Sequence, residues 1–307
     1  MTEFRYKKCH KWQLSAPLVV NLYVISQCNI SCKYCYAYLP SNKFYIPTLN
    51  QLMNIIDQLK NNGVFQLHIA GGEPFLRPDL QEIVLGASEK GLHVCLLTNG
   101  SLIKEDDMDW LNVFTNKFHG RIQISLDSQH SFINDKIRGE TEKILKNIDM
   151  LIKNNLSFNI GCVISSINVE TAETIINYFY PKIKMFHFMP VMKSFKVAKA
   201  IEIIPTTKKL NEFFERLQTE RLKFPDDLTI SNPPSECEKQ RFSLSNFWFP
   251  GCCAAKTRVD IDSNFDVYAC SIAWNSRLGS LNEKSFKEIW NSQIALQFRG
   301  LESYPCD

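Results

Sequence analysis

Three closely spaced cysteines constrain this chain more than any other feature. Cys28, Cys32 and Cys35 have the spacing C-x3-C-x2-C, and the apolar residues 18–25 before them predict a buried strand. A loop that leaves a strand can turn three thiolates toward one centre, which a regular helix or strand cannot do. Thiolates bind soft or borderline metals, so zinc and an iron–sulfur cluster are the candidates. Structural zinc needs four closed ligands, and no fourth Cys or His lies nearby.

Composition places the chain among globular proteins and excludes several partners. With 307 residues, 45% of them hydrophobic, it can form one large domain and a small appendage. The net charge of +3 is nearly balanced and its cations are dispersed, so no nucleic-acid or membrane partner is expected. Residues 1–11 are too polar for a signal peptide. Eleven cysteines without an export signal favour metal ligation in a reducing cytoplasm.

Strands and helices alternate from residue 18 to about residue 222. Six βα units predict a parallel sheet with helices outside it, and six are too few for a closed eight-stranded barrel. The predicted strands are 18–25, 66–70, 92–97, 121–126, 158–164 and 184–188. The predicted helices are 49–61, with Thr48 and Gln51 as a capping box, then 79–90, 104–113, 141–154, 171–179 and 210–221. Cys95, Cys162, His68 and His187 fall inside strands, and we expect them in the core.

Ligands of parallel α/β folds bind at the carboxyl ends of strands, so these ends locate the candidate site. The second strand ends in Gly71-Gly72-Glu73-Pro74, where two glycines let the backbone approach a ligand and Glu73 can pair with a cation. Thr98-Asn99-Gly100 ends the third strand and has a supporting role. The fourth ends at Ser125, followed by Asp127, which is expected to approach substrate or ribose. Arg138, thirteen residues after Ser125, suits a carboxylate because its guanidinium binds one bidentately. An ordinary turn and a solvated surface charge are the alternatives.

The cysteine loop, the Gly-Gly-Glu-Pro turn and the βα alternation together resemble the radical S-adenosylmethionine (radical SAM) superfamily. The resemblance implies an open (β/α)6 partial TIM-like barrel. It also implies a [4Fe–4S] cluster on Cys28, Cys32 and Cys35 whose open iron chelates SAM. An electron then cleaves SAM to methionine and a 5′-deoxyadenosyl radical, which abstracts hydrogen from the substrate.

The same resemblance assigns roles to the residues at the strand ends. Tyr34, just before the third cysteine, is expected near the adenine. Gly71, Gly72 and Glu73 are expected to hold the methionine ammonium of SAM. Ser125 and Arg138 are expected to hold its carboxylate. The domain organisation expected from these assignments is an N-terminal extension at 1–17, the partial barrel at 18–230 and a cysteine-rich module at 231–307.

The C-terminal module carries a second set of cysteines around a predicted β-hairpin at 257–270. The order cysteine, hairpin, cysteine and the following Leu-Gly-Ser and Ile-Trp-Asn-Ser stretches resemble the truncated SPASM, or Twitch, module. This resemblance implies one auxiliary [4Fe–4S] cluster, with structural zinc as the alternative. A second auxiliary cluster is not expected, because the further cysteines of a full SPASM domain are absent. Phe265 departs from the family pattern, which has glycine in the hairpin turn. The preferred ligands are Cys252, Cys270 and Cys306, with Cys237, Cys253 or substrate as the fourth.

Cys253 has a second interpretation, because neighbouring residues in an extended chain face opposite ways and rarely reach one cluster together. Cys253, or else the isolated Cys237, is then a spare thiol beside the barrel mouth that gives a hydrogen atom to a substrate radical, which would make the enzyme an epimerase. Otherwise Cys253 packs or completes the auxiliary cluster.

Three functions remain open at this point. The first is a radical SAM oxidoreductase that modifies a peptide by crosslinking or epimerisation. The second is a dehydrogenase or epimerase of a small metabolite in the same superfamily. The third is a non-catalytic iron–sulfur or zinc sensor or scaffold, which would need none of Glu73, Ser125 and Arg138. A catalytic role requires a reductant such as flavodoxin or ferredoxin. No winged-helix segment is recognised before residue 18, which argues against a self-contained peptide maturase and leaves peptide recognition to a separate protein.

Overall fold

A computed structural model describes residues 14–35, 45–192, 201–225, 227–231, 253–270, 272 and 275–300. Its strands form a single open sheet in the order β10-β9-β8-β1-β2-β3-β4-β5-β6-β7. The strands are β1 (Val19–Tyr23), β2 (Gln66–Ala70), β3 (His93–Thr98), β4 (Arg121–Ser125), β5 (Phe158–Ile164), β6 (Met185–Pro190), β7 (Thr229–Ser231), β8 (Arg258–Ile261), β9 (Asp266–Tyr268) and β10 (Arg277–Ser280). The predicted mixed α/β fold with an open parallel sheet is confirmed.

The parallel part of the sheet is longer than the sequence predicts. Six parallel strands are expected, and β1 to β6 provide them. Strand β7 extends the sheet beyond β6, also in parallel. Strand β8 pairs in parallel with β1, with Val19 opposite Arg258, before β9 turns back antiparallel to it. The predicted hairpin therefore forms, and it also adds a strand to the barrel sheet.

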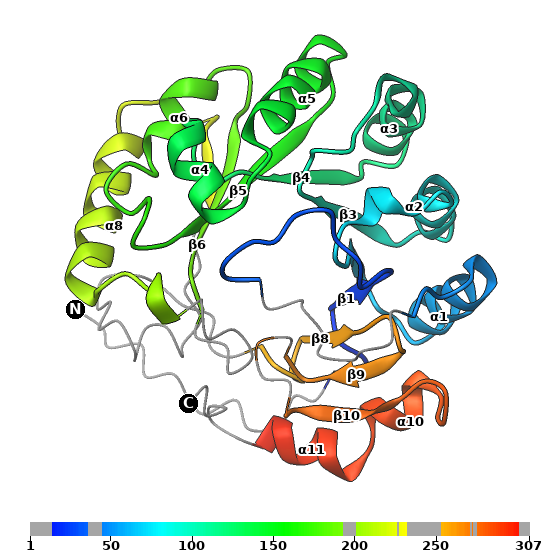
Figure 1. The fold of residues 1–307 in the computed structure, drawn as a ribbon. Helices are drawn as coiled ribbons and strands as arrows, with labels where there is room; N and C mark the ends of the chain where they lie inside the picture. The colour runs from blue at the N-terminus through cyan, green and yellow to red at the C-terminus, as the bar shows by residue number, and fades with distance from the viewer. Residues whose placement is uncertain are drawn as a thin grey trace, which may run out of the picture.

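The helices follow the expected βα alternation and lie outside the curved sheet (Figure 1). They are α1 (Leu49–Asn61), α2 (Leu80–Glu89), α3 (Met108–Asn112), α4 (Ser131–Ile137), α5 (Thr141–Lys153), α6 (Thr174–Phe179), α8 (Thr207–Arg221), α10 (Phe286–Trp290) and α11 (Gln293–Gly300). Thr48 and Gln51 form the predicted capping box of α1. The helix expected at 104–113 is irregular, since a 3-10 turn precedes α3 and a π turn follows it. Helices α4 and α11 were not predicted, whereas the sequence does predict a helix through Phe286, Ile289 and Trp290, which forms as α10.

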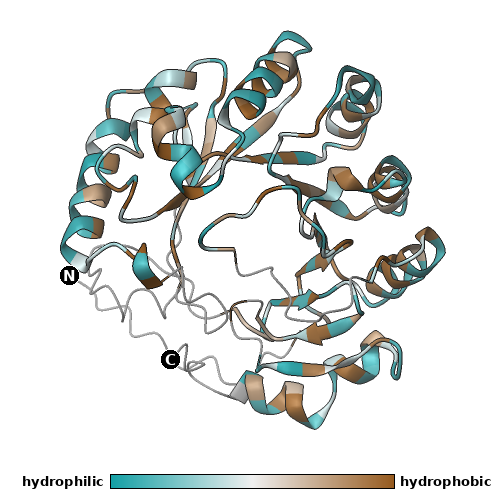
Figure 2. Cartoon of the chain, in the orientation of Figure 1, coloured by the Kyte–Doolittle hydropathy of each residue, from teal (hydrophilic) through white to brown (hydrophobic). Residues whose placement is uncertain are grey.

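The two faces of the sheet have opposite character. One face carries fully buried aliphatic residues such as Leu22, Leu67 and Leu96, which belong to the main hydrophobic core. Figure 2 shows this apolar material on the strands and on the sheet-facing sides of α1, α2 and α5. Helices therefore cover the outer face of the sheet, as the continuous apolar strands predict.

The inner face is polar in its central layer. Asp260, Asn21, His68 and Cys95 are opposite one another on β8, β1, β2 and β3, so their side chains share a face. Asn21 donates from Nδ2 to Asp260 Oδ1, and the His68 ring lies 2.8 Å from Gln66 Nε2. Burial lowers the pKa of His68 from 6.5 to about 3, and the nearby cation of Arg258 adds to this effect. His68 is thus a hydrogen-bonded, neutral interior histidine, as expected.

The C-terminal segment shares its core with the barrel. Phe286, Trp290 and Val259 are buried in the same cluster as the barrel strands. Phe265, in the hairpin turn, has a φ of 67° and is only 3% exposed. The boundary expected near residue 230 stays a prediction, because residues 232–252 are outside the described part of the chain. Among the helices of the described ranges, none is both long and apolar enough to cross a membrane.

Candidate active site

The site is organised by the cysteine loop, residues 26–35, which leaves the carboxyl end of β1. The loop crosses the ends of the neighbouring strands on the inner side of the sheet (Figure 1). Cys28 is exposed, while Cys32 and Cys35 are partly buried. Each of three neighbouring strands, β2, β3 and β4, supplies a contact that fixes one part of the loop.

The turn after β2 holds the beginning of the loop. Gly72 donates its N–H to the Ile25 carbonyl at 2.7 Å, and Glu73 donates its N–H to the Gln27 carbonyl at 2.8 Å. A Cβ on Gly72 would lie 2.0 Å from the Gln27 oxygen, and one on Gly71 would lie 2.4 Å from the Ile25 oxygen. The sequence suggests that these glycines expose backbone groups to a ligand. In the structure their close approach is to the cysteine loop, and the Gly72 and Glu73 amides are already used there.

Glu73 links β2 to the end of β3 and is 1% exposed. Its carboxylate accepts hydrogen bonds from Thr98 Oγ1 at 2.6 Å, from the Asn99 N–H at 2.7 Å and from the Phe75 N–H at 3.0 Å. Burial raises the pKa of Glu73, and these three bonds oppose the rise. Asn99 in turn donates to Asn29 Oδ1 at 2.9 Å. The expected supporting role of the Thr-Asn-Gly turn therefore consists of tying Glu73 to the cysteine loop.

The end of β4 holds the last part of the loop. The Tyr34 hydroxyl donates to Asp127 Oδ2 at 2.6 Å, and Arg138 donates from Nη1 to the Tyr34 oxygen. Arg138 Nη1 lies 3.6 Å from Asp127 Oδ2, with 9% of the Arg138 side chain exposed. Burial raises the pKa of Tyr34 well above its usual value. Asp127 is fully buried and bonded on both oxygens, so the expected approach to substrate or ribose is not seen.

The surroundings of Arg138 suit the expected role of binding the SAM carboxylate. Its Nε is buried and has no hydrogen-bond partner within the described ranges. A guanidinium in such a position suits a bidentate carboxylate. Ser125, the other expected carboxylate contact, is the last residue of β4 and lies opposite Gly161 of β5. Ser125 is thus at a strand end beside the cysteine loop, and Arg138, at the end of α4, contacts that loop through Tyr34.

The three thiols of the loop are not gathered around one point in this structure. No three Cys, His, Asp or Glu side chains of the described residues lie close enough together to hold one metal ion. A cubane binds its thiolates at separate corners, so they need not meet at a point. Burial raises the pKa of Cys32 to about 12, and the nearby Arg138 cation opposes this rise. A metal bound by Cys32 would have to displace the proton of this thiol.

The two described cysteines of the C-terminal segment, Cys253 and Cys270, lie at the other end of the sheet. Because β8 starts opposite Val19 at the amino end of β1, Cys253 precedes that end, and its carbonyl accepts the Arg258 N–H at 3.2 Å. The Ala255 N–H reaches the Ala269 carbonyl at 3.3 Å, which brings the approaches to Cys253 and Cys270 together. Cys253 is therefore not beside the mouth that holds Cys28. The proposed ligands Cys237, Cys252 and Cys306 lie outside the described residues.

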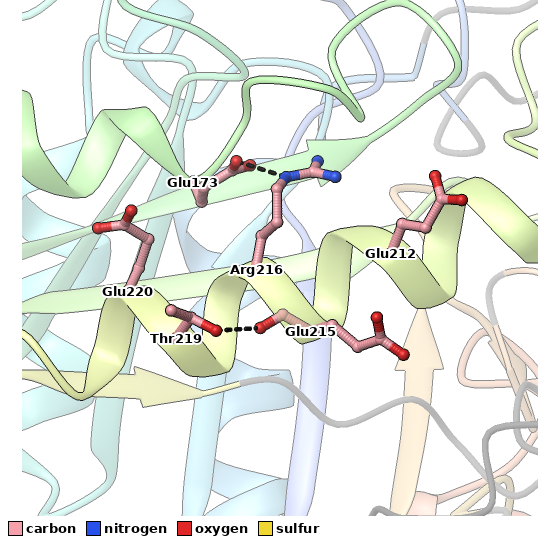
Figure 3. Close-up of a pocket in the computed structure, with 6 residues that line it drawn as sticks. All are labelled: Glu173, Glu212, Glu215, Arg216, Thr219 and Glu220. Atoms are coloured by element: carbon pink, nitrogen blue, oxygen red, sulfur yellow. Dashed lines mark hydrogen bonds and ion pairs between the residues drawn. The ribbon is translucent and has the colours of Figure 1, made fainter.

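A hollow on the outer surface is distinct from this site. It has a volume of about 410 Å³ and lies along α8, lined by Glu173, Glu212, Glu215, Arg216, Thr219 and Glu220 (Figure 3). Arg216 Nε donates to Glu173 Oε1 at 2.7 Å. Glu220 pairs with Lys223 at 2.6 Å. The acidic lining is thus partly neutralised by its own neighbours, and it contains no residue of the cysteine loop.

Sequence reasoning missed two parts of the site. Asn29 joins the loop to Ser101 Oγ at 2.9 Å and to Asn99, although nothing but its position between cysteines indicates this. Helix α4 carries Arg138 at its end and binds the loop through the Ile137 carbonyl, which accepts the Lys33 N–H at 3.0 Å. The short helix is mostly polar, so it lacks an apolar period that would predict it.

Comparison with known proteins gives consistent results over nearly the whole chain. The sequence profile described as "Radical SAM superfamily" matches residues 22–179, and that of the "Iron-sulfur cluster-binding domain" (SPASM) matches residues 252–307. The AdoMet-dependent heme synthase of Methanosarcina barkeri is 24% identical, covering 94% of this chain and 86% of that protein. The PqqA peptide cyclase of Xanthomonas oryzae is 25% identical, covering 94% and 78%. The crystal structure of Streptococcus suis SuiB bound to SAM, at 19% identity, aligns with a TM-score of 0.79 over 93% of this chain and 68% of that one.

Proposed function

This chain belongs to the radical SAM superfamily, and we propose that it abstracts a hydrogen atom from a C–H bond of a peptide. The modification proposed is a crosslink or an epimerisation within a ribosomally made precursor. Support comes from the PqqA peptide cyclase, a relative over 94% of this chain whose name specifies a peptide. The observation that carries the proposal is the loop of three cysteines fixed across the ends of β2, β3 and β4.

The cofactors of this enzyme are a SAM-binding [4Fe–4S] cluster, SAM and an auxiliary iron–sulfur cluster. When bound and reduced, the first cluster supplies the electron that cleaves SAM and leaves a 5′-deoxyadenosyl radical. We assign Cys28, Cys32 and Cys35 as its ligands. The proposed ligands of the auxiliary cluster are Cys252, Cys270 and Cys306, with Cys237 as a further candidate.

The residues of this chain divide the task of binding SAM. Arg138 and Ser125 hold the SAM carboxylate in this proposal, because Arg138 Nε is buried beside the cysteine loop and has no hydrogen-bond partner among the described residues. The oxygens of Glu73 already accept hydrogen bonds inside the protein. Glu73 therefore attracts the methionine ammonium of SAM through its negative charge and not through a direct hydrogen bond. Gly71 and Gly72 act indirectly, by letting the β2 turn pack against the cysteine loop. Tyr34 borders the adenine with its ring while its hydroxyl is held by Asp127.

The inner face of the sheet is the proposed substrate wall. Asn21, His68 and Asp260 form a polar layer below the cysteine loop, with Cys253 and Cys270 beyond them at the amino end of β8. A polar wall suits the amide groups of a peptide backbone, because buried amides need hydrogen-bond partners. A radical formed at the carboxyl ends of the strands would then meet a peptide lying against this layer.

A small metabolite is the second candidate substrate. The heme synthase relative covers the same 94% of this chain at 24% identity, so overall similarity does not separate the two classes. In either case the enzyme needs an electron donor, and we propose a flavodoxin or a ferredoxin. For a peptide substrate we also propose a separate recognition protein.

Deuterium transfer separates these substrate classes. Cluster-loaded, reduced enzyme is incubated with SAM and with deuterated forms of short peptides encoded beside its gene. A peptide substrate transfers deuterium to 5′-deoxyadenosine, and the product peptide shows a crosslink by mass loss or an inverted residue by chiral analysis. The variant with Cys28, Cys32 and Cys35 changed to Ala is the control without SAM cleavage. Transfer from a small metabolite and from none of the peptides would overturn the peptide proposal.

A further inference from the structure

Asp127 is held by hydrogen bonds on every side. It follows β4 and is 0% exposed. Its Oδ1 accepts the Val163 N–H of β5 at 2.8 Å, and its Oδ2 accepts the Tyr34 hydroxyl at 2.6 Å. Its own N–H donates to Asn134 Oδ1 at 3.0 Å, and its carbonyl accepts from Asn168 Nδ2 at 2.8 Å. Both carboxylate oxygens therefore accept hydrogen bonds from the protein, and the group cannot shift without breaking several of them.

The Tyr34 hydroxyl lies between this fixed carboxylate and Arg138. It donates to Asp127 and accepts from Arg138 Nη1, so its single oxygen uses both kinds of hydrogen bond. The Arg138 guanidinium carbon lies 5.6 Å from the centre of the Tyr34 ring. Arg138 thus uses Nη1 within the protein, while Nε is left without a partner among the described residues.

Two backbone contacts make this arrangement a connection between the cysteine loop and α4. The Lys33 N–H donates to the Ile137 carbonyl at 3.0 Å, and the Arg138 N–H donates to the Asn134 carbonyl at 2.7 Å. Asn134 is also the residue that binds the Asp127 N–H. The loop with the cysteines and the helix end with the guanidinium therefore share one anchor, which is Asp127.

We propose that Asp127 is a positioning residue that acts through Tyr34 and Arg138 and presets the guanidinium for the SAM carboxylate. The inference rests on the proposed function, in which Arg138 binds that carboxylate. Without the fixed acceptor, Arg138 loses the partner that directs its Nη1 inward. Tyr34 then also loses its acceptor, and the last turn of the cysteine loop moves relative to the helix end.

Two substitutions test this role in the cluster-loaded enzyme. Asp127→Asn keeps an oxygen for the Val163 N–H, but its NH2 group cannot accept from Tyr34. Tyr34→Phe keeps the ring and removes only the hydroxyl that links Asp127 to Arg138, leaving the weaker 3.6 Å ion pair between Arg138 and Asp127. We expect Asp127→Asn to weaken SAM binding about tenfold or more and Tyr34→Phe to weaken it less. Asp149→Asn, an exposed change on α5, is the matched control and should bind SAM like wild type.

Non-additivity separates positioning from a general loss of structure. Arg138→Lys alone should weaken SAM binding, because an ammonium cannot copy the bidentate fork. Adding Asp127→Asn to Arg138→Lys should then have little further effect, since both act on one contact. Iron content and the electron paramagnetic resonance spectrum of the reduced cluster without SAM should match wild type, while the spectral change on adding SAM should need more SAM.

The SAM affinities of these variants distinguish a failure of the carboxylate clamp from a failure of the positioning role. If Arg138→Lys binds SAM like wild type, the carboxylate clamp of the proposed function is wrong and the inference fails with it. If Arg138→Lys is impaired while Asp127→Asn and Tyr34→Phe bind normally, the clamp stands and the positioning role is refuted. If Asp127→Asn does not fold, Tyr34→Phe alone decides: normal SAM affinity refutes the role, and weakened affinity with normal iron content supports it.

Discussion

Gly72→Ala tests whether the glycine turn serves the cysteine loop. The added Cβ would lie 2.0 Å from the Gln27 carbonyl oxygen and 2.7 Å from that of Ser26, both of them backbone atoms. Real Cβ contacts essentially never fall below 3.0 Å, so the loop must retreat by at least 1.0 Å (3.0 − 2.0). The retreat breaks the Gly72–Ile25 and Glu73–Gln27 backbone hydrogen bonds. These bonds are worth about 0.5–1.5 kcal/mol each, and overpacking costs about 1–3 kcal/mol, so we expect a total loss of about 2–6 kcal/mol.

Because the displaced backbone leads directly into Cys28, cluster assembly should suffer more than the fold. The assay is iron and sulfide content after anaerobic reconstitution, together with urea unfolding of the same preparations. Gly63→Ala is the control, since Gly63 has a φ of 88° and nothing within 4 Å of the added Cβ. It should lose about 1–2 kcal/mol from backbone strain and keep its full iron content. A Gly72→Ala protein with wild-type iron and SAM cleavage would refute this account of the turn.

Three further predictions concern the inner wall, the hairpin and Cys253. In the unfolded chain His68 takes up a proton near pH 6.5, whereas in the folded protein burial lowers the pKa of His68 to about 3. The free energy of unfolding is therefore full above pH 6.5 and falls as the pH drops toward 3. Between about pH 7 and about pH 5.5, wild type should lose about 1.3 kcal/mol more than His68→Gln in urea unfolding, and equal losses would contradict this. Phe265→Gly relieves about 1–2 kcal/mol of left-handed strain but removes a buried ring worth about 3–5 kcal/mol, so it should destabilise; a higher urea midpoint would show that strain dominates. Because Cys253 lies toward the amino end of β8, away from Cys28, Cys253→Ala should leave the solvent deuterium in product made in heavy water unchanged; lost incorporation with both clusters retained would establish the donor role, and a loss of about four irons would make Cys253 a ligand.

Much of the fold follows from local patterns in the sequence. Strand β2 is marked by its apolar residues, and the start of α1 is marked by its capping box. Both signals lie within a few residues of the element that they predict. The partner of β8 cannot be read in this way. Its parallel register, with Val19 opposite Arg258, joins positions 239 residues apart. Only this register shows that Cys253 and Cys270 lie toward the amino ends of the strands, away from Cys28.

The site shows the same limit. The three cysteines, Glu73 and Arg138 stand out because their chemistry at strand ends is unusual. Asp127 looks like a ligand residue for the same reason, yet its oxygens turn inward to Tyr34 and the Val163 N–H. Side-chain direction at a strand end depends on which neighbours offer donors, and these come from distant parts of the chain.

The most direct test of the central claim is the amount of 5′-deoxyadenosine formed per chain after reduction with SAM present. Protein reconstituted anaerobically should hold about eight irons and form 5′-deoxyadenosine. The variant with Cys28, Cys32 and Cys35 changed to Ala should keep about four irons and form none. A wild-type protein that holds its iron but leaves SAM intact, or a triple variant that still cleaves SAM, would contradict the account.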